Sequence, residues 1–269
     1  MSAWSRLDRE LDQWREQGKR ATFWLRDDDA CRNTEALRRL LAIADAHQAP
    51  LALAVIPAQL DASLVSALAP HDGVSVVQHG YAHRNHAPAG ERSGELGAHR
   101  PPSDVLAELA DGRDRLAGAF GTCFEPILVP PWNRIDAGVV ARLSGAGYCG
   151  LSTFGPRASL FAAPGLRQCN AHVDLVAWRK DRAFIGADAA TDRCVAHLRA
   201  RREAAVDAAE PTGILTHHLD LGADAWQFLD MLLQRTRGHA AAAWLDVTAA
   251  FAAHDGADTV TAVTCGRSA

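Results

Sequence analysis

Two histidines at metal-ligand spacing are the first sign of chemistry in this sequence. His79 and His83 are four residues apart, so a helical turn would bring both imidazoles to one face, where they can share a metal ion. The chain has 12 histidines, and random placement at that frequency gives about half such a pair per chain. The pair therefore needs support from other residues before it indicates a metal site.

Support comes from three consecutive carboxylates, Asp27, Asp28 and Asp29, which follow an apolar segment. Adjacent carboxylates repel one another, and a bound cation offsets the repulsion because it favours the ionised form of each. Two imidazoles and one carboxylate form a three-ligand set suited to zinc or another first-row divalent ion with open coordination positions. We therefore expect one divalent ion, with zinc as the first candidate, and a remaining carboxylate free to act as a base.

The elements that position these residues are predicted from apolar periodicity and from start and stop signals. Strands are expected at 21–26, 51–56, 74–78, 126–129, 148–152, 173–178, 213–216 and 259–264. Helices are expected at 3–18, 34–47, 59–68, 105–119, 136–144, 191–208 and 222–236. The alternation of strands and helices predicts an α/β fold with a mainly parallel sheet, open or closed into a barrel.

The polar residues gather at one kind of position in this pattern. Four groups follow the carboxyl ends of predicted strands, namely Asp28 with Asp29, His79, Pro131 with Trp132, and His217. In β/α barrels the active site is built at that edge of the sheet. We therefore expect the active site at the carboxyl ends of the strands.

The region 84–102 has no periodicity and lies beside the two histidines. Loops of this length in compact domains are usually functional lids or disordered segments. Glu95 and Arg100 within it are expected to form either a solvated pair or a contact with the substrate. Arg100 is therefore included among the substrate-binding candidates.

Size and composition fit a soluble globular protein, and by length it could form two small domains or one large one. The 269 residues are 48% hydrophobic and 22% charged, and β/α barrels of about 250 residues commonly form a single domain, which we expect to cover 1–269. A formal net charge of -4 argues against a nucleic-acid partner. The charged N-terminus lacks an apolar signal segment, and no apolar run reaches membrane-spanning length, so we expect no transmembrane segment and a cytoplasmic location. The six scattered cysteines are expected to be free thiols.

Four short motifs resemble, in their order, those of the polysaccharide deacetylases. They are Arg-Asp-Asp-Asp-Ala at 26–30, His-Gly-Tyr-Ala-His at 79–83, Pro-Pro-Trp-Asn at 130–133 and Ile-Leu-Thr-His-His at 214–218. Together they span most of the chain. The resemblance implies a distorted β/α barrel and a metal-dependent hydrolase that removes acetyl groups from N-acetylated sugars.

The resemblance also implies roles for individual residues. Asp28 would be the general base and His217 the general acid. The metal ligands would be Asp29, His79 and His83. Pro131 and Trp132 would form a wall against the substrate, where a backbone N–H also meets it.

Several positions depart from the family pattern. Ala30 stands where the family has glycine, and the additional Asp27 leaves the register of the paired aspartates open by one residue. Val129 stands where the family has an arginine beside the base, so Arg26 or Arg100 would have to replace it.

A further departure concerns the acid. His218 stands where the family has an aspartate, so either His217 or His218 can be the acid, and His218 is also a substrate-binding candidate. Asp174 and Trp178 lie near the place where the family orients its acid histidine, although their spacing is loose.

The expected function is hydrolysis of a non-peptide carbon–nitrogen bond in a small-molecule or glycan substrate. Removal of an N-acetyl or other N-acyl group from a sugar or glycan precursor is the first expectation. Two alternatives remain open: hydrolysis of a carbon–nitrogen bond in a non-carbohydrate molecule, and a non-catalytic carbohydrate-binding protein with a residual metal site. Asp28 and His217 favour an enzyme, because a binding protein needs neither a base nor an acid.

Overall fold

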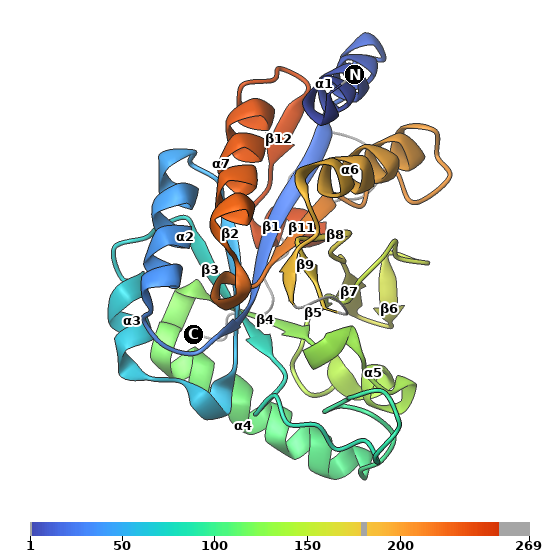
Figure 1. Ribbon diagram of the computed structural model, residues 1–269. Helices are drawn as coiled ribbons and strands as arrows, with labels where there is room; N and C mark the ends of the chain where they lie inside the picture. The colour runs from blue at the N-terminus through green and yellow to red at the C-terminus, as the bar shows by residue number, and fades with distance from the viewer. Residues whose placement is uncertain (1, 179–181, 253–269) are drawn as a thin grey trace.

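The computed structural model describes residues 2–178 and 182–252, and Figure 1 shows their strands gathered into one curved sheet with helices around it. The strands are β1 (Ala21–Ala30), β2 (Leu51–Val55), β3 (Val74–His79), β4 (Phe124–Val129), β5 (Gly150–Leu151), β6 (Phe161–Ala163), β7 (Leu166–Gln168), β8 (Val173–Asp174), β9 (Val176–Ala177), β10 (Ala183–Phe184), β11 (Thr212–Thr216) and β12 (Ala242–Trp244). The α-helices are α1 (Ala3–Glu16), α2 (Glu35–Ala46), α3 (Ala62–Leu68), α4 (Pro102–Phe120), α5 (Ala137–Leu143), α6 (Ala187–Arg202), α7 (Ala223–Arg237) and α8 (Val247–Ala252).

Seven parallel strands lie side by side in the order β8, β11, β1, β2, β3, β4, β5. The two ends of this series meet, because Phe154, just after β5, forms a parallel bridge with Ala171, just before β8. β12 pairs with the first residues of β1, and β6 and β7 form an antiparallel pair beyond β5. The predicted distorted β/α barrel with mainly parallel strands is therefore confirmed.

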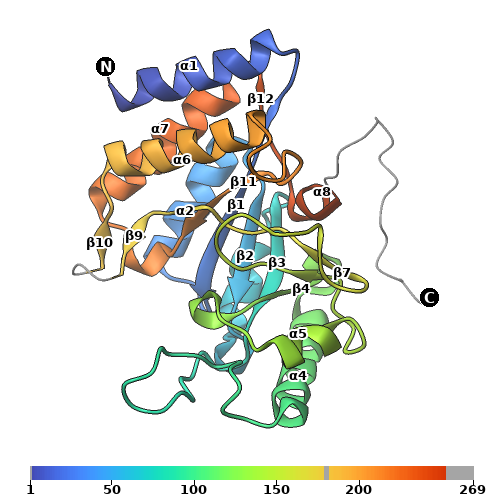
Figure 2. The ribbon, with the colours of Figure 1, turned by 90° about the vertical axis from the view of Figure 1, so that its right-hand side faces the viewer.

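The barrel interior is a packed core at its amino end. Trp24, Val77 and Ile127 belong to one buried cluster with Phe251 of α8, the helix that Figure 2 shows beside the strands. A Cβ atom on Gly150 would lie 2.7 Å from the Phe251 ring, so this position needs glycine. The Phe251 side chain fills the amino end of the barrel. The polar cavity described below lies at the opposite end, where the strands have their carboxyl ends.

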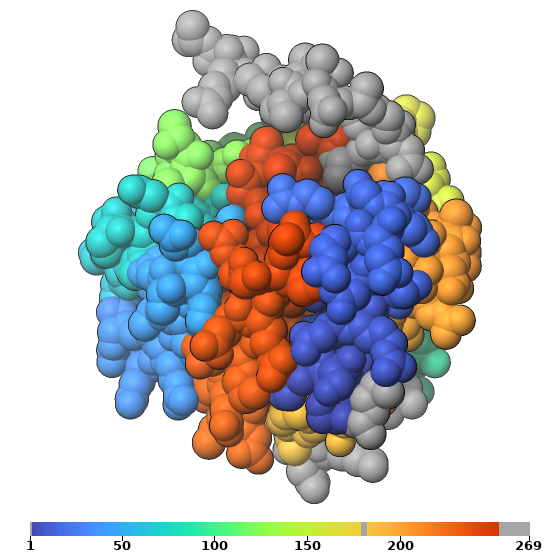
Figure 3. All heavy atoms as spheres, turned by 90° about the horizontal axis from the view of Figure 1, so that it is seen from above, coloured from blue at the N-terminus to red at the C-terminus, as the bar shows by residue number. Residues whose placement is uncertain are grey.

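The first helix packs beside α6 and α7. Trp4 stacks on Phe228 of α7 with ring centroids 5.2 Å apart, and Glu10 pairs with Arg202 of α6 at 2.7 Å. Figure 3 shows α1 lying along α7 on this face of the molecule. None of the helices within the described ranges has both the length and the apolar character needed to cross a bilayer.

Most predicted elements form, with shifted bounds. The helix expected at 105–119 begins at Pro102, directly after Pro101, and the strand expected at 173–178 splits into β8 and β9. The pattern did not predict β6, β7, β10, β12 or α8, which have six residues or fewer each. The strand expected at 259–264 lies outside the described residues. The five cysteines that the structure describes form no disulfide with one another, which agrees with the prediction.

Candidate metal centre

A bulge in β1 separates the three consecutive aspartates. The register between β1 and β2 shifts between Asp27 and Ala30, and Asp29 has a φ angle of 71°, in the left-handed region. In a regular strand Asp27 and Asp29 would point to the same side. Instead Asp28 and Asp29 both line the cavity, while Asp27 is fully buried. The bulge therefore brings two neighbouring carboxylates into one site.

Asp29 lies between the two predicted imidazole ligands. Its Oδ1 atom is 3.1 Å from Nε2 of His79 and 3.3 Å from Nε2 of His83, and the three potential ligand atoms lie within 4.8 Å of one another. Nδ1 of His79 is 3.0 Å from the Val129 carbonyl. A carbonyl only accepts, so this nitrogen carries the proton and leaves the Nε2 lone pair for a metal.

These atoms fit a cation. The lone pair of His79 Nε2 faces a carboxylate oxygen, and Asp29 Oδ1 is buried without a hydrogen bond of good geometry in the described part of the chain. Burial raises the pKa of Asp29, but the close approach of His79 and the charges of the nearby imidazoles bring it well below its usual range. Burial and the charge of His79 lower the pKa of His83. An ionised carboxylate and a neutral imidazole are the forms that bind a divalent ion.

The segment from His79 to His83 is a bent loop, so the helical turn expected there is wrong. Gly80 and His83 have φ angles of 53° and 54°, and the ring centroids of the two histidines are 5.1 Å apart. The strand end and this bend, and not a helical face, therefore bring the rings together.

Glu95 holds this loop in place. Its carboxylate accepts hydrogen bonds from the backbone N–H groups of Tyr81 at 3.0 Å, Ala82 at 2.7 Å and Arg84 at 3.3 Å. A Cβ atom on Gly80 would come within 2.1 Å of a Glu95 oxygen, which explains the glycine. Glu95 is 1% exposed, so it neither forms a solvated pair nor contacts the cavity. No spacing in the sequence pointed to this role.

The cationic neighbour of Asp28 is Arg26. Its Nε atom lies 2.9 Å from Oδ1 of Asp28, and its Nη2 atom donates to Oδ2 at 3.0 Å. Arg26 is fully buried and also donates to Ser152 Oγ at 2.7 Å and Asn133 Oδ1 at 2.8 Å. The other candidate for this place, Arg100, instead forms a two-pronged ion pair with Glu108 at 2.6 and 2.7 Å and does not line the cavity.

His217 lies between two carboxylates. Its Nε2 atom is 3.9 Å from Oδ2 of Asp28, and its Nδ1 atom is 3.9 Å from Oδ1 of Asp174. Trp178 donates to Asp174 Oδ2 at 2.7 Å and meets the His217 ring edge-on at 4.5 Å. Burial raises the pKa of Asp174, while the charge of His217 lowers it. The indole and the carboxylate therefore lie on one side of the His217 ring, and Asp28 lies on the other.

His218 has a different partner. Its Nδ1 atom is 2.5 Å from Oδ1 of Asp27, and its backbone N–H donates to the same carboxylate at 2.9 Å. Thr216 donates a third hydrogen bond to Asp27 at 2.7 Å. Burial lowers the pKa of His218, but the charge of Asp27 raises it overall. Asp27 is therefore used to join the ends of β1 and β11 and to position His218.

Trp132 forms a wall beside the candidate metal ligands. Its φ angle is 55°, which is uncommon for a bulky residue, and its ring centroid lies 4.4 Å from that of His83. Trp132 lines the cavity, whereas Pro131 is buried behind it against Gly80.

One cavity of about 1680 Å³ contains these groups. Its walls include seven of the nine predicted site residues, namely Asp28, Asp29, His79, His83, Trp132, His217 and His218. Pro131 and Arg100 are the two that it does not include. The arrangement offers a metal site, an ionic pair holding a carboxylate and an oriented imidazole, all facing one space.

Comparisons with known proteins agree with this geometry. No family model and no curated protein matches the sequence. A candidate polysaccharide deacetylase from Mycobacterium smegmatis has a similar structure, with a TM-score of 0.63 and 15% identity over 85% of this chain and 88% of that chain. The chain has the polysaccharide deacetylase fold.

Two further structures share the deacetylase fold. A peptidoglycan N-acetylglucosamine deacetylase matches with a TM-score of 0.55 and 14% identity, over 90% of this chain and 97% of that chain. A CE4 family pseudoenzyme from Bacillus anthracis matches with a TM-score of 0.54 and 14% identity, over 87% of this chain and 66% of that chain.

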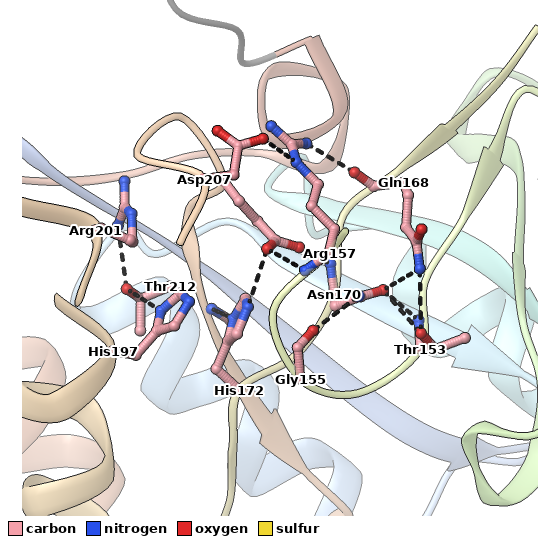
Figure 4. Close-up of polar contacts among 12 residues, drawn as sticks. Thr153, Gly155, Arg157, Gln168, Asn170, His172, His197, Arg201, Asp207 and Thr212 are labelled. Atoms are coloured by element: carbon pink, nitrogen blue, oxygen red, sulfur yellow. Dashed lines mark hydrogen bonds and ion pairs between the residues drawn. The ribbon is translucent and has the colours of Figure 1, made fainter. Parts of the chain in front are cut away.

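In this deacetylase fold a second group of potential ligands lies beside β11, and Figure 4 shows its surroundings. His172, His197 and Glu210 are buried, with potential ligand atoms within 4.8 Å of one another. The Gly213 N–H donates to Nδ1 of His172 at 2.9 Å. The neutral ring therefore carries its proton on Nε2, 3.4 Å from Glu210, and has no lone pair for a metal there.

The same network ties a loop to the barrel. Glu210 accepts hydrogen bonds from the backbone N–H groups of Arg157 and Asn170, both at 2.8 Å. The Glu210 carboxylate is thus hydrogen-bonded to the backbone of the segment between β5 and β8, where the barrel closes. We interpret this group as a structural network and not as a second metal site.

Proposed function

We propose that this protein is a metal-dependent hydrolase that removes an N-acyl group, in the first instance N-acetyl, from a sugar or glycan precursor. The observation that carries the proposal is the placement of Asp28 and His217 beside the Asp29–His79–His83 ligand set in one cavity. A metal site alone serves binding as well as catalysis. A carboxylate and an imidazole that face the same space provide a base and an acid.

Asp29, His79 and His83 would hold the divalent ion. Two imidazoles and one carboxylate are a known zinc ligand set that leaves a position open, so we propose zinc. When bound, the ion supplies Lewis-acid activation of the acyl carbonyl and of water.

Asp28 is the general base in this proposal. Its two-pronged pair with Arg26 fixes the position of the carboxylate beside a positive charge. It takes the proton of the attacking water at Oδ2, the oxygen that faces His217. The backbone N–H of Trp132 is our candidate donor to the developing oxyanion.

His217 is the general acid. The imidazole protonates the departing amine nitrogen, which is otherwise a poor leaving group. Asp174 lies behind Nδ1 and stabilises the imidazolium, so Nε2 presents the proton to the substrate. His218 is less suited to this task because its Nδ1 is held by Asp27, at the junction of β1 and β11.

The test is acetate release from N-acetylglucosamine and its oligomers by the metal-loaded protein. We expect release that is abolished in Asp28→Asn and reduced far more in His217→Asn than in His218→Asn. A second candidate function is binding without turnover, since a CE4 family pseudoenzyme shares the fold. That function gains if the protein holds its metal and binds these sugars but releases no acyl group from any of them.

A further inference from the structure

The cavity that contains the metal ligands is bordered by arginines. Five arginines line it, and we call them the arginine rim: Arg32, Arg92, Arg134, Arg182 and Arg193. All five are exposed, whereas the lining carboxylates Asp28, Asp29 and Asp174 are largely buried at the floor. The whole chain has a formal net charge of -4, so this accumulation of positive charge is local.

Three members of the arginine rim form no ion pair across residues 2–178 and 182–252, namely Arg92, Arg134 and Arg193. Arg32 has no ion pair within 4.0 Å either, but it is attracted to Asp61 and contacts Cys31. Arg134 donates to the carbonyl of Ser93 at 2.6 Å, which places it beside the segment that carries Arg92. The fifth member, Arg182, pairs with Asp220 at 3.0 Å. By contrast, the floor carboxylates already have Arg26, the candidate metal or His217 as partners.

Aromatic side chains lie between two members of the arginine rim and the proposed catalytic and metal-binding residues. Arg182 lies over the Trp178 ring, 5.1 Å from its centroid, and Trp178 meets the ring of His217 at 4.5 Å. On another side, Arg134 follows Trp132 by two residues, and Trp132 packs against the ligand His83. A molecule whose acyl group reaches Asp28 and His217 therefore extends past these guanidinium groups.

Unpaired guanidinium groups at a cavity mouth favour an oxyanion. Arginine binds phosphate through two parallel hydrogen bonds. A carboxylate carries a single charge, whereas a phosphate monoester carries about two at neutral pH, which better matches several unpaired cations. We propose that the substrate is an N-acylated sugar that bears a phosphate group, either as a sugar phosphate or as a nucleoside diphosphate sugar. The inference rests on the proposed function and names its substrate class.

The first experiment compares acyl release from three probes, which are N-acetylglucosamine, N-acetylglucosamine 1-phosphate and UDP-N-acetylglucosamine. We expect kcat/KM to be at least about tenfold higher for a phosphorylated probe, since one charged hydrogen bond is worth about that factor. The preference should decrease with added salt, because the arginine rim is exposed. A preference for the diphosphate over the monophosphate identifies a nucleotide sugar, and the reverse a sugar phosphate. Equal kcat/KM for neutral and phosphorylated probes overturns the inference and leaves the proposed function standing.

Substitutions in the arginine rim show whether it causes the preference. Arg134→Gln and Arg193→Gln should each reduce the ratio of phosphorylated to neutral kcat/KM by about tenfold. Arg199→Gln is the matched control, because Arg199 is exposed on the same helix as Arg193 but does not line the cavity. An unchanged ratio in both rim variants overturns the inference.

Binding separates this inference from the proposed function. Calorimetric titration of the Asp28→Asn variant with N-acetylglucosamine 1-phosphate should show binding that Arg134→Gln and Arg193→Gln weaken about tenfold each. Binding that depends on these arginines, without acyl release by the unsubstituted protein, supports the phosphate site and overturns the hydrolase. Binding of unchanged affinity in the double variant Arg134→Gln/Arg193→Gln overturns the phosphate site, because these arginines then do not hold the phosphate.

Discussion

Asp27, Asp28 and Asp29 are neighbours in the sequence but have different partners in space. Asp27 accepts three hydrogen bonds from the end of β11, Asp28 pairs with Arg26, and Asp29 faces the two imidazoles. Repulsion between the carboxylates is relieved because each has a positive or hydrogen-bonding neighbour of its own. Adjacent substitutions should therefore have different consequences.

Asp29→Asn and Asp28→Asn should differ in metal content. Asp29→Asn removes the only anionic ligand of the set, so we expect the purified protein to lose most of its divalent ion. Asp28→Asn leaves the three ligands intact, so about one ion per chain should remain while acyl release is lost. Elemental analysis by plasma mass spectrometry measures the first effect. A full complement of metal in Asp29→Asn would contradict the ligand assignment.

Arg26→Gln should destabilise the folded protein. The substitution leaves the Asp28 carboxylate, which is 2% exposed, without its cation. Breaking a buried ion pair by removing one partner costs about 3–5 kcal/mol, which urea unfolding measures. The double variant Arg26→Gln/Asp28→Asn removes the unpaired charge and should recover part of this loss. Additive losses in the double variant would show that the pair does not interact energetically.

At the scale of the elements, the backbone that carries the candidate ligand His83 depends on a residue later in the same loop. Glu95 lies in the loop before α4 and fixes the backbone of Tyr81, Ala82 and Arg84 through its two oxygens. The region between β3 and α4 is therefore anchored next to the metal site. Its backbone contacts, and not its side-chain chemistry, connect it to the imidazoles.

Glu95→Gln should weaken metal binding without unfolding the protein. Glutamine offers one oxygen acceptor where three N–H groups converge, so the loop that carries His83 loosens. Groups that orient metal ligands typically contribute 10–100-fold to affinity, and we expect a loss of about that size. Competition with a chromogenic chelator measures the affinity. Glu91→Gln, in the same loop but exposed, is the control and should bind metal as the unsubstituted protein does.

The sequence predicted the strand ends well because apolar runs and polar residues alternate clearly there. His79, Trp132 and His217 lie at the ends of β3, β4 and β11, where the pattern placed them. It did not predict the bulge at Asp29, because a bulge depends on the register with β2. It also did not predict the contact of Glu95 with Gly80, because packing between loops has no periodicity. Short elements such as β12 lack enough residues to show a period.

At the scale of the whole molecule, the buried histidines link folding to pH. His197 and His172 stack at 3.5 Å between α6 and the strands. Burial, with the charges of His172 and Arg201, lowers the pKa of His197 to about 2. Burial also lowers the pKa of His172, although Glu210 acts in the opposite direction. The folded protein therefore favours the neutral form of both rings.

The free energy of unfolding should decrease as the solution is acidified. The unfolded chain protonates His197 near pH 6.5, while the folded protein keeps it neutral down to about pH 2. The contribution is therefore full above pH 6.5 and is lost as the pH falls below it. Linkage gives about 2 kcal/mol between pH 6.5 and pH 5 for one such group. Urea unfolding at pH 7 and pH 5 measures it.

His197→Gln isolates this contribution. The variant has no group to protonate at this position, so its stability should change by about 2 kcal/mol less over the same pH interval. His99→Gln, in the loop before α4, serves as the control and should keep the pH dependence of the unsubstituted protein. An identical slope in His197→Gln would assign the acid sensitivity to other groups.

The position of Phe251 has a consequence for access to the cavity. Within the described residues, α8 fills the amino end of the barrel, and the cavity lies at the carboxyl ends of the strands, so we expect substrates to enter and products to leave at that end. The carboxylic acid and the amine that hydrolysis produces must dissociate through this opening before the next substrate binds. A long polymer cannot pass through a barrel that is filled at one end. It therefore has to insert a chain end or bind across the opening of the cavity. When substrate entry and product release use the same opening, compact substrates are favoured. Slow product release can then limit the turnover rate.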